Sequence, residues 1–254
     1  MMKLRNFLNK LTRPAPLQEF DNYDGYWEAR LKLEGEPPLL YRHRHIAQKL
    51  SPGASVLDIG CGEGVFLRHL RETRPDCTAV GADISSGAVE RLRGDGFECV
   101  LLEPYLPLEQ HFDQCFDYVV MMEVLEHVHE AEEFALQGAR LAKHQLFVTL
   151  PNVGFFRHRL RLGLFGRFPI TNIQCHMKEH IRFWSLTDFA EWCQHLGLKL
   201  RSVSAQWDKS DGKLSYWLVN WRPNLFAQQV IYEINTTSEP RTILEKSDTV
   251  LRDQ

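Results

Sequence analysis

Residues 56–64, with the sequence VLDIGCGEG, are the clearest candidates for binding chemistry in this chain. An apolar run ending in Asp58 is followed by three glycines at alternate positions, Gly60, Gly62 and Gly64. Glycine lets the backbone turn sharply and leaves its N–H groups open to an approaching ligand. The pattern therefore predicts a buried strand, a tight turn that contacts a ligand, and a helix that starts near Val65.

The spacing of the glycines indicates which ligand binds there. A dinucleotide site carries G-x-G-x-x-G, whereas here the third glycine comes one residue early and Val65 occupies the expected position. This spacing disfavours a nucleotide-dependent oxidoreductase. The sequence Asp58-x-Gly60-x-Gly62-x-Gly64 instead resembles the first motif of class I S-adenosylmethionine-dependent methyltransferases.

A second acid follows about twenty residues after the glycines. Residues 78–83, TAVGAD, form a short apolar run that ends in Asp83, where a doubly wound fold places a carboxylate for the two ribose hydroxyls. The alternative is that Asp83 caps the helix expected from Ser85 onward. Because Ser85 can itself cap that helix, Asp83 and Ser85 can divide the two roles.

Residues 116–128, FDYVVMMEVLEHV, form another distinctive segment. They resemble the fourth-strand motif of small-molecule methyltransferases, most closely the ubiquinone-pathway O-methyltransferases. The resemblance implies that Met122 touches the methionine part of the cofactor, that Arg42 holds its carboxylate, and that Glu103 lies near its adenine. The complete predicted cofactor-binding set is Arg42, Asp58, Gly60, Cys61, Gly62, Asp83, Ile84, Glu103 and Met122.

An acidic–histidine cluster follows this strand. Glu123, Glu126 and His127 have the i, i+3, i+4 spacing that would place them on one helix face, and His180 could be a fourth ligand. Metal-dependent O-methyltransferases with this pattern use a Mg²⁺ ion to bind a diol or catechol acceptor, so the resemblance allows a Mg²⁺ site here. The alternative is a packing and capping motif without metal. In that case His127 or His180 is the expected general base.

Three downstream segments, residues 149–157, 166–171 and 180–189, resemble the methionine-biosynthesis W protein family. Together with the glycine motif, this similarity extends from Val56 to Leu200. That family lacks the N-terminal region of about fifty residues and the clear acidic–histidine cluster of this chain. These differences favour a catalytic methyltransferase over a non-catalytic partner that activates a biosynthetic acyltransferase.

Composition limits the remaining possibilities. The 254 residues are 44% hydrophobic and 25% charged, with a net charge of −3, which is typical of a globular domain with no overall attraction to nucleic acid. The six cysteines form no C-x-x-C pair, and the basic first thirteen residues lack the long apolar centre of a secretory signal. We therefore expect reduced thiols and a cytoplasmic protein.

Alternating strand and helix patterns position these motifs. They predict an α/β fold, namely a Rossmann-like doubly wound sheet of seven mostly parallel strands with an antiparallel final strand. The expected segments are 55–59, 65–72, 78–82, 85–93, 98–102, 116–121, 131–142, 145–150, 186–196, 199–206 and 226–234. We expect a helical region at 1–50, the methyltransferase domain at 51–235 with an insertion over the site at 153–184, and a flexible tail at 236–254.

The insertion contains aromatic residues among Arg157, Arg159, Arg161 and Arg167. We interpret these arginines as the solvated face of a segment whose Phe and Leu residues are buried. The alternatives are an anionic acceptor site or contact with a membrane surface, which the apolar stripe near Leu8 and Leu11 could share. We predict transfer of a methyl group to a hydroxyl, less favourably an amine, of a small-molecule or glycan-like acceptor. A third possibility is metal-dependent RNA 2′-O-methylation through a basic groove.

Overall fold

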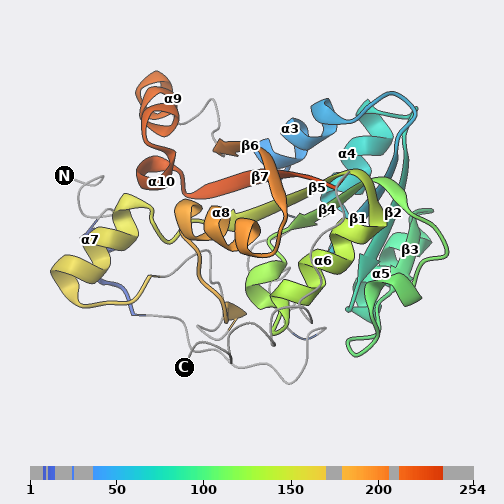
Figure 1. Cartoon of the computed structure of the whole chain (residues 1–254), viewed down its shortest axis with the longest axis horizontal. Coiled ribbons are helices and arrows are strands. Elements are labelled where there is room, and N and C mark those ends of the chain that lie inside the picture. The colour runs from blue at the N-terminus through green and yellow to red at the C-terminus, as the bar shows by residue number, and fades with distance from the viewer. Residues whose placement is uncertain are drawn as a thin grey trace, which may run out of the picture.

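The computed structural model describes residues 8–9, 11–14, 25, 37–169, 179–205 and 212–236. A single seven-stranded sheet crosses the molecule, and helices cover both of its faces (Figure 1). The strands are β1 (Ser55–Ile59), β2 (Thr78–Asp83), β3 (Glu98–Leu101), β4 (Phe116–Met122), β5 (Ala142–Pro151), β6 (Lys199–Ala205) and β7 (Gln229–Asn235). The longer helices are α3 (Tyr41–Lys49), α4 (Val65–Thr73), α5 (Ser86–Gly94), α6 (Ala131–Leu141), α7 (Phe156–Phe165), α8 (Leu186–His195) and α9 (Gly212–Trp221). Three short helices complete the elements, namely η1 (Leu108–Gln110), η2 (Leu125–His127) and α10 (Pro223–Phe226).

The strand order is β3-β2-β1-β4-β5-β7-β6. Strands β1 to β5 pair in parallel, whereas β7 runs antiparallel to both of its neighbours, β5 and β6. This confirms the predicted doubly wound sheet with an antiparallel final strand. The order reverses between β1 and β4, so the crevice at the carboxyl ends of these strands is the expected ligand site.

Alternating side chains on the central strands form two apolar cores. Leu57 and Val119 face α6 and α8, while Val56 and Val120 face α3 and α4, and all four side chains are fully buried. Because both faces of a parallel sheet are covered, its strands consist of nearly continuous apolar residues, which explains why the sequence pattern identified them.

Two segments differ from the sequence prediction by more than one residue at an end. Strand β5 begins at Ala142 rather than residue 145, because Ala142 pairs with Phe116 across a register shift. The predicted strand at 226–234 is divided, since α10 ends at Phe226 and β7 begins at Gln229. Among the described helices, none combines the length and the apolar character needed to cross a bilayer.

Several predicted segments lie partly outside the described residues. Most of the region at 1–36, residues 170–178 of the insertion and all of the 236–254 tail except Thr236 belong to this group, as does Cys175. The other five cysteines are free thiols.

Candidate functional site

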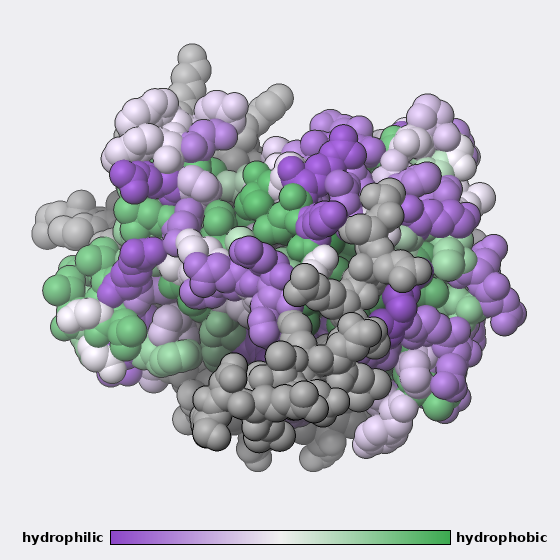
Figure 2. Space-filling view, in the orientation of Figure 1, coloured by the Kyte–Doolittle hydropathy of each residue, from purple (hydrophilic) through white to green (hydrophobic). Residues whose placement is uncertain are grey.

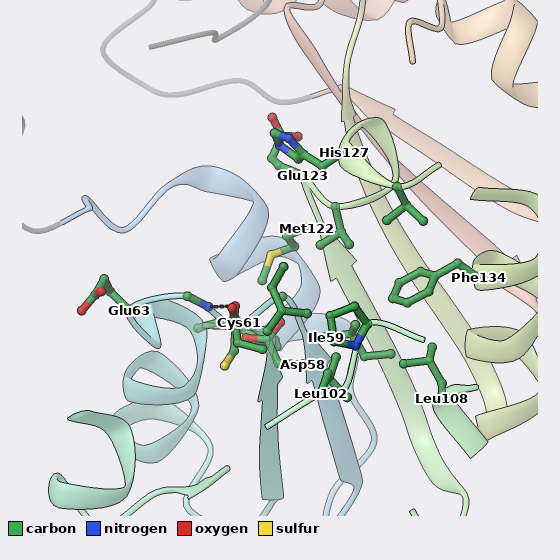
Figure 3. Close-up of a pocket in the computed structure, with 18 of the residues that line it drawn as sticks. Asp58, Ile59, Cys61, Glu63, Leu102, Leu108, Met122, Glu123, His127 and Phe134 are labelled. Atoms are coloured by element: carbon green, nitrogen blue, oxygen red, sulfur yellow. Dashed lines mark hydrogen bonds between the residues drawn. The ribbon is translucent and has the colours of Figure 1, made fainter. Parts of the chain in front are cut away.

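A cavity of about 1280 Å³ opens at the carboxyl ends of the central strands, where the sheet order reverses (Figure 3). All nine predicted cofactor-binding residues line it, namely Arg42, Asp58, Gly60, Cys61, Gly62, Asp83, Ile84, Glu103 and Met122. They come from α3 and from the ends of four strands. The fold therefore brings together residues that are up to 80 positions apart in the sequence.

The glycine turn has the backbone that its residue types require. Gly60, Gly62 and Gly64 all have positive φ angles, of 72°, 49° and 71°. A Cβ on Gly60 would lie 2.5 Å from Cγ2 of Val124, so packing as well as conformation excludes a larger residue there. The N–H groups of Gly60 and Cys61 both donate to the carbonyl of Ala82, at 2.7 and 3.1 Å, which fixes the turn against β2.

Asp83 locks the same turn from the end of β2. Its carboxylate accepts hydrogen bonds from the backbone N–H groups of Gly62, at 2.8 Å, and Ser85, at 2.9 Å. Burial raises the pKa of Asp83, and these backbone donors oppose that rise. Ser85 caps α5 by accepting from the N–H of Ala88, as predicted. The carboxylate of Asp83 is therefore not needed as the cap of this helix.

Asp58 presents an unsatisfied carboxyl oxygen next to this turn. The side chain is 1% exposed, and within the described part of the chain its Oδ1 has no hydrogen-bond partner. Burial, followed by the nearby Asp83, raises its pKa well above the ordinary value. A buried polar atom without a partner is costly, so this oxygen fits a site where a ligand supplies a hydrogen-bond donor.

Arg42 is held by a chain of polar side chains that the sequence did not reveal. Its guanidinium donates to Oε1 of Gln229 at 2.9 Å, and Nε2 of Gln229 donates to Oε2 of Glu123 at 2.7 Å. The hydroxyl of Thr149 donates to the other Glu123 oxygen at 3.1 Å. These contacts link α3, β7, β4 and β5, and they direct Arg42 into the cavity that it lines.

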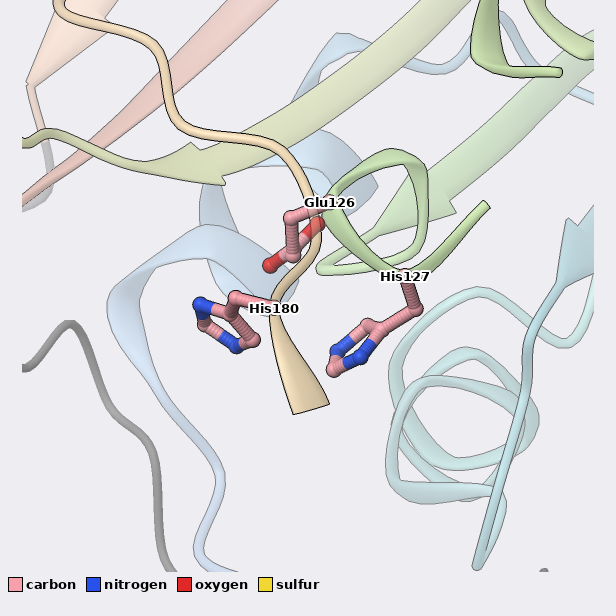
Figure 4. A group of neighbouring side chains, drawn as sticks. All are labelled: Glu126, His127 and His180. Atoms are coloured by element: carbon pink, nitrogen blue, oxygen red, sulfur yellow. The ribbon is translucent and has the colours of Figure 1, made fainter. Parts of the chain in front are cut away.

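Glu126, His127 and His180 converge beside the cavity (Figure 4). One ligand atom from each lies within 4.8 Å of the others, and the two imidazole rings are 4.7 Å apart and nearly perpendicular. The segment at residues 179–182 is tied to this turn, because the N–H groups of Ile181 and Arg182 both donate to the carbonyl of Glu126. His180 therefore lies next to the fourth-strand motif, as predicted.

The protonation of this cluster follows from its surroundings. His127 Nδ1 lies 2.5 Å from the carbonyl of Glu179, which requires a proton on Nδ1 and places the lone pair of the neutral ring on Nε2. Burial lowers the pKa of His180 to about 3, with His127 contributing, so His180 is neutral at pH 7. Glu126 is 1% exposed, neither of its carboxyl oxygens has a partner in the described chain, and burial, followed by Glu123, raises its pKa well above the ordinary value.

The predicted helix face that would unite Glu123 with this cluster is wrong. Glu123 has a positive φ of 57° and precedes η2, a single three-residue turn, so the α-helical spacing does not apply. Its carboxylate is bound by Thr149 and Gln229 instead. The converging donors are two imidazoles and one carboxylate, a set that does not fit the oxygen ligands preferred by Mg²⁺.

The predicted insertion contributes less to the cavity than expected. Of its described residues, only Glu179 and His180 line the cavity, while α7 lies at the far left of Figure 1. Arg161 is buried and donates to the carbonyls of Leu11 and Phe168. One of the four arginines that we expected to be solvated is therefore buried. A basic groove for RNA that uses all four arginines is not present. Trp184, also in this segment, packs in the core against Phe189.

Other cavity-lining residues had no signal in the sequence. They include Leu40, Tyr41, Leu102, Leu108, Phe134, Gln228 and Gln229. Most are apolar residues of loops and helix ends, whose position depends on the complete sheet. Gln229 lies at the start of β7 opposite Pro151 of β5, and no local sequence pattern identifies its side chain as part of the cavity.

Comparison with known proteins identifies the family. Residues 41–234 match the family model of the methionine biosynthesis protein MetW. The chain belongs to this family. It is 23% identical over 179 residues to the bifunctional methionine biosynthesis protein MetXA/MetW of Rhodopirellula baltica, with 66% of this chain and 28% of that protein covered. The chain therefore spans less than a third of the length of this relative.

Methyltransferases are also among the similar proteins. The ubiquinone biosynthesis O-methyltransferase of Xylella fastidiosa is 26% identical over 215 residues, with 78% of this chain and 83% of that protein covered. A SAM-dependent methyltransferase structure from Aquifex aeolicus matches with a TM-score of 0.53 and 15% identity, covering 86% of this MetW-family chain and 100% of the other. The chain is thus a MetW-like protein with the class I methyltransferase fold.

Proposed function

We propose that this MetW-family chain transfers the methyl group of S-adenosylmethionine to a hydroxyl of a small-molecule or glycan-like acceptor. The observation that carries the proposal is that one cavity contains both the nine predicted cofactor residues and the two histidines. Typical small-molecule sites occupy about 300–1000 Å³, so a cavity of about 1280 Å³ has room for a cofactor and an acceptor together.

The glycine turn and the two buried acids form the cofactor end of the site. Asp83 would accept from the ribose hydroxyls, since a carboxylate has capacity for acceptance beyond its two backbone bonds. Arg42 would bind the carboxylate of the methionine part, with Gln229 and Glu123 holding its guanidinium in place. When bound, the cofactor supplies an activated sulfonium methyl group, so these residues mainly position it in line with the acceptor oxygen.

His127 is the proposed general base. The Glu179 carbonyl fixes the ring with its lone pair on Nε2, the tautomer needed to accept the proton of an acceptor hydroxyl. His180 has a pKa lowered to about 3, so it is a weaker base and is better suited to orient the acceptor. Apolar residues such as Leu40 and Phe134 would exclude water around the acceptor.

Calorimetric titration with S-adenosylhomocysteine tests the cofactor end. We expect binding to native protein and at least tenfold weaker binding to Asp83→Asn, because hydrogen bonds to charged groups contribute about 1.5–3 kcal/mol each. Asp117→Asn is the matched control, since Asp117 also accepts from a backbone N–H, that of Ser55, but lies outside the cavity lining. Equal binding by native protein and Asp83→Asn would exclude the ribose assignment.

Turnover distinguishes an enzyme from a partner protein. Native protein is expected to methylate a hydroxylated acceptor, and His127→Gln to bind S-adenosylhomocysteine normally while losing about 100-fold in rate, the lower end for general-base catalysis. The relative in which MetXA and MetW share one chain suggests the contrary outcome. Cofactor binding without turnover, together with copurification of an acyltransferase, would favour a non-catalytic activating role.

A metal site is a second proposal for the same cluster. Two imidazoles and one carboxylate suit Zn²⁺, Mn²⁺ or Fe²⁺ better than Mg²⁺, and the unpartnered oxygens of Glu126 offer a ligand. Elemental analysis after dialysis against each metal should then show one bound transition metal, lost in Glu126→Gln. If no metal is retained and chelator leaves turnover unchanged, the cluster has a base and packing role only.

A further inference from the structure

Helix α9 exposes two tryptophans that pack on each other. Trp217 and Trp221 are 58% and 56% exposed, and their rings stack with centroids 5.4 Å apart and planes 18° apart. Tyr216 beside them is 53% exposed. Tryptophan is usually largely buried, so two exposed indoles on one helix indicate a surface that is covered by a partner when the protein functions.

The aromatic surface continues from α9 to α7. The ring centroids of Trp221 and Phe226 of α10 are 6.4 Å apart, and those of Phe226 and Phe156 of α7 are 6.0 Å apart. Further along α7 and the following turn, four large apolar side chains are at least 40% exposed, namely Leu162, Leu164, Phe165 and Phe168. In Figure 1 these three helices gather at the end of the molecule remote from β3, and Figure 2 shows apolar side chains over α7 on that side.

Together these helices contain basic but no acidic side chains. Residues 153–178 and 212–232 contain no Asp or Glu, although the whole chain has 33 acidic residues and a net charge of −3. Arg222 lies against the ring of Trp221, with its guanidinium 5.3 Å from the ring centroid, and Arg167 is exposed on the turn after α7. Basic and aromatic side chains are therefore interleaved. We call this surface, formed by Leu162, Leu164, Phe165, Arg167, Phe168, Trp217, Trp221 and Arg222, the aromatic–arginine face.

We propose that the aromatic–arginine face binds the surface of a lipid bilayer containing anionic phospholipids. Indole rings favour the headgroup region of a bilayer, leucine and phenylalanine side chains enter the acyl boundary, and arginines attract anionic headgroups. This combination is what α9 and α7 present. The inference is independent of the proposed methyl transfer, since none of the residues of this face lines the cavity.

Two other partners fit the observations less well. Single-stranded RNA stacks its bases on open aromatic faces, but here the indoles stack on each other, and Leu162 and Leu164 have no role in base stacking. An acidic protein would account for Arg167 and Arg222. However, its contact would have to extend over both α9 and α7, whereas a bilayer meets all protruding side chains at once.

Vesicle flotation with the full chain tests the proposal. Native protein is expected to float with phosphatidylcholine vesicles that contain phosphatidylglycerol, and much less with phosphatidylcholine alone or at high salt. Trp217→Ala with Trp221→Ala should abolish flotation, and Arg167→Gln or Arg222→Gln should each weaken vesicle affinity about fivefold. The matched controls are Leu101→Ala, on the edge strand β3, and Arg201→Gln, an exposed arginine of β6, which should float like native protein.

Thermal unfolding of every variant verifies that it is folded, so that a loss of flotation reports on the surface. The proposal is overturned if native protein does not bind anionic vesicles, or if the tryptophan double variant binds them as well as native protein. Binding of a single-stranded RNA oligonucleotide that competes with the vesicles and is lost in the tryptophan variant, without any flotation, would replace the bilayer with nucleic acid.

Discussion

Gln229 connects two charged side chains from distant parts of the chain. Arg42 lies 187 residues before it and Glu123 lies 106 residues before it, yet its amide accepts from one and donates to the other. Leucine at this position would keep the volume but remove both hydrogen bonds. Because hydrogen bonds to charged groups contribute about 1.5–3 kcal/mol, we expect Gln229→Leu to weaken S-adenosylhomocysteine binding at least tenfold in calorimetric titrations.

The expected change in Gln229→Leu is one of affinity rather than of rate at saturating cofactor, since His127 is not part of this chain of contacts. Gln110→Leu, an exposed glutamine of η1, serves as the control and should bind like native protein. Native affinity in Gln229→Leu would mean that Arg42 needs no support from β7.

At the scale of single residues, sequence patterns correctly predicted the features that depend on local backbone geometry. The turn at Gly60 and the cap at Ser85 follow from residue type and spacing, so both were found. Glu123 was assigned wrongly because its i, i+3, i+4 relation to Glu126 and His127 assumes an α-helix, and the left-handed backbone at Glu123 breaks that relation. Gln229 was missed because its partners are defined only by sheet pairing.

At the scale of elements, Asn152 joins the end of β5 to α8 and α10. Its amide nitrogen donates to the carbonyls of Asn224 and Ala227, and its Oδ1 accepts from the N–H of Gly154. The side chain is 1% exposed. Asn152→Ala would leave these backbone groups buried without partners, which costs about 1–3 kcal/mol for each unsatisfied group.

We therefore expect Asn152→Ala to lower the free energy of unfolding by at least about 3 kcal/mol in urea titrations. Asn220→Ala is the control, because Asn220 is exposed and its amide donates to the carbonyl of Tyr216 within α9, and its effect should stay within about 0.5 kcal/mol. A similar loss in both variants would contradict the role of Asn152 as the link between these elements.

The elements from β1 to β4, apart from the short helix η1, agree with the predicted segments to within one residue at their ends. Their boundaries coincide with glycines, caps and changes of periodicity that are visible locally. The later elements were less predictable, since β5 is extended by the pairing of Ala142 with Phe116 of β4 and since Asn224 holds α10 against α8 through contacts that no sequence window contains. Non-local pairing, rather than weak propensity, limits the prediction there.

Across the whole molecule, a net charge of −3 conceals an uneven distribution. Acids line the cavity, among them Asp58, Asp83 and Glu123, whereas α7, α9 and α10 contain none. A negative cavity attracts a sulfonium cation, and a basic surface attracts anionic headgroups. The net charge alone predicts no overall attraction to nucleic acid, because it averages these regions, and only the fold separates them.

Buried ionisable groups make stability depend on pH in opposite directions. His43 is 6% exposed, its Nδ1 accepts from the N–H of Leu40 at 2.9 Å, and burial, with Arg42 as the next cause, lowers its pKa from 6.5 to about 3. The unfolded chain therefore binds more protons there between these pH values, so this contribution to stability falls as the pH drops below 6.5. The raised pKa of Asp58 acts oppositely, since its contribution is lost as the pH rises above its ordinary value of 3.8.

A substitution at His43 isolates one of these contributions. In urea titrations from pH 8 to pH 4.5, the stability of native protein minus that of His43→Gln should decrease by about 1.4 kcal/mol for each pH unit below 6.5. The same difference should be constant above pH 7.5. A constant difference for His43→Gln would show that the folded protein accepts a proton at this site without cost. Because an imidazolium has no lone pair on Nδ1, the bond from the Leu40 N–H at the wall of the cavity would then contribute little to keeping this ring neutral.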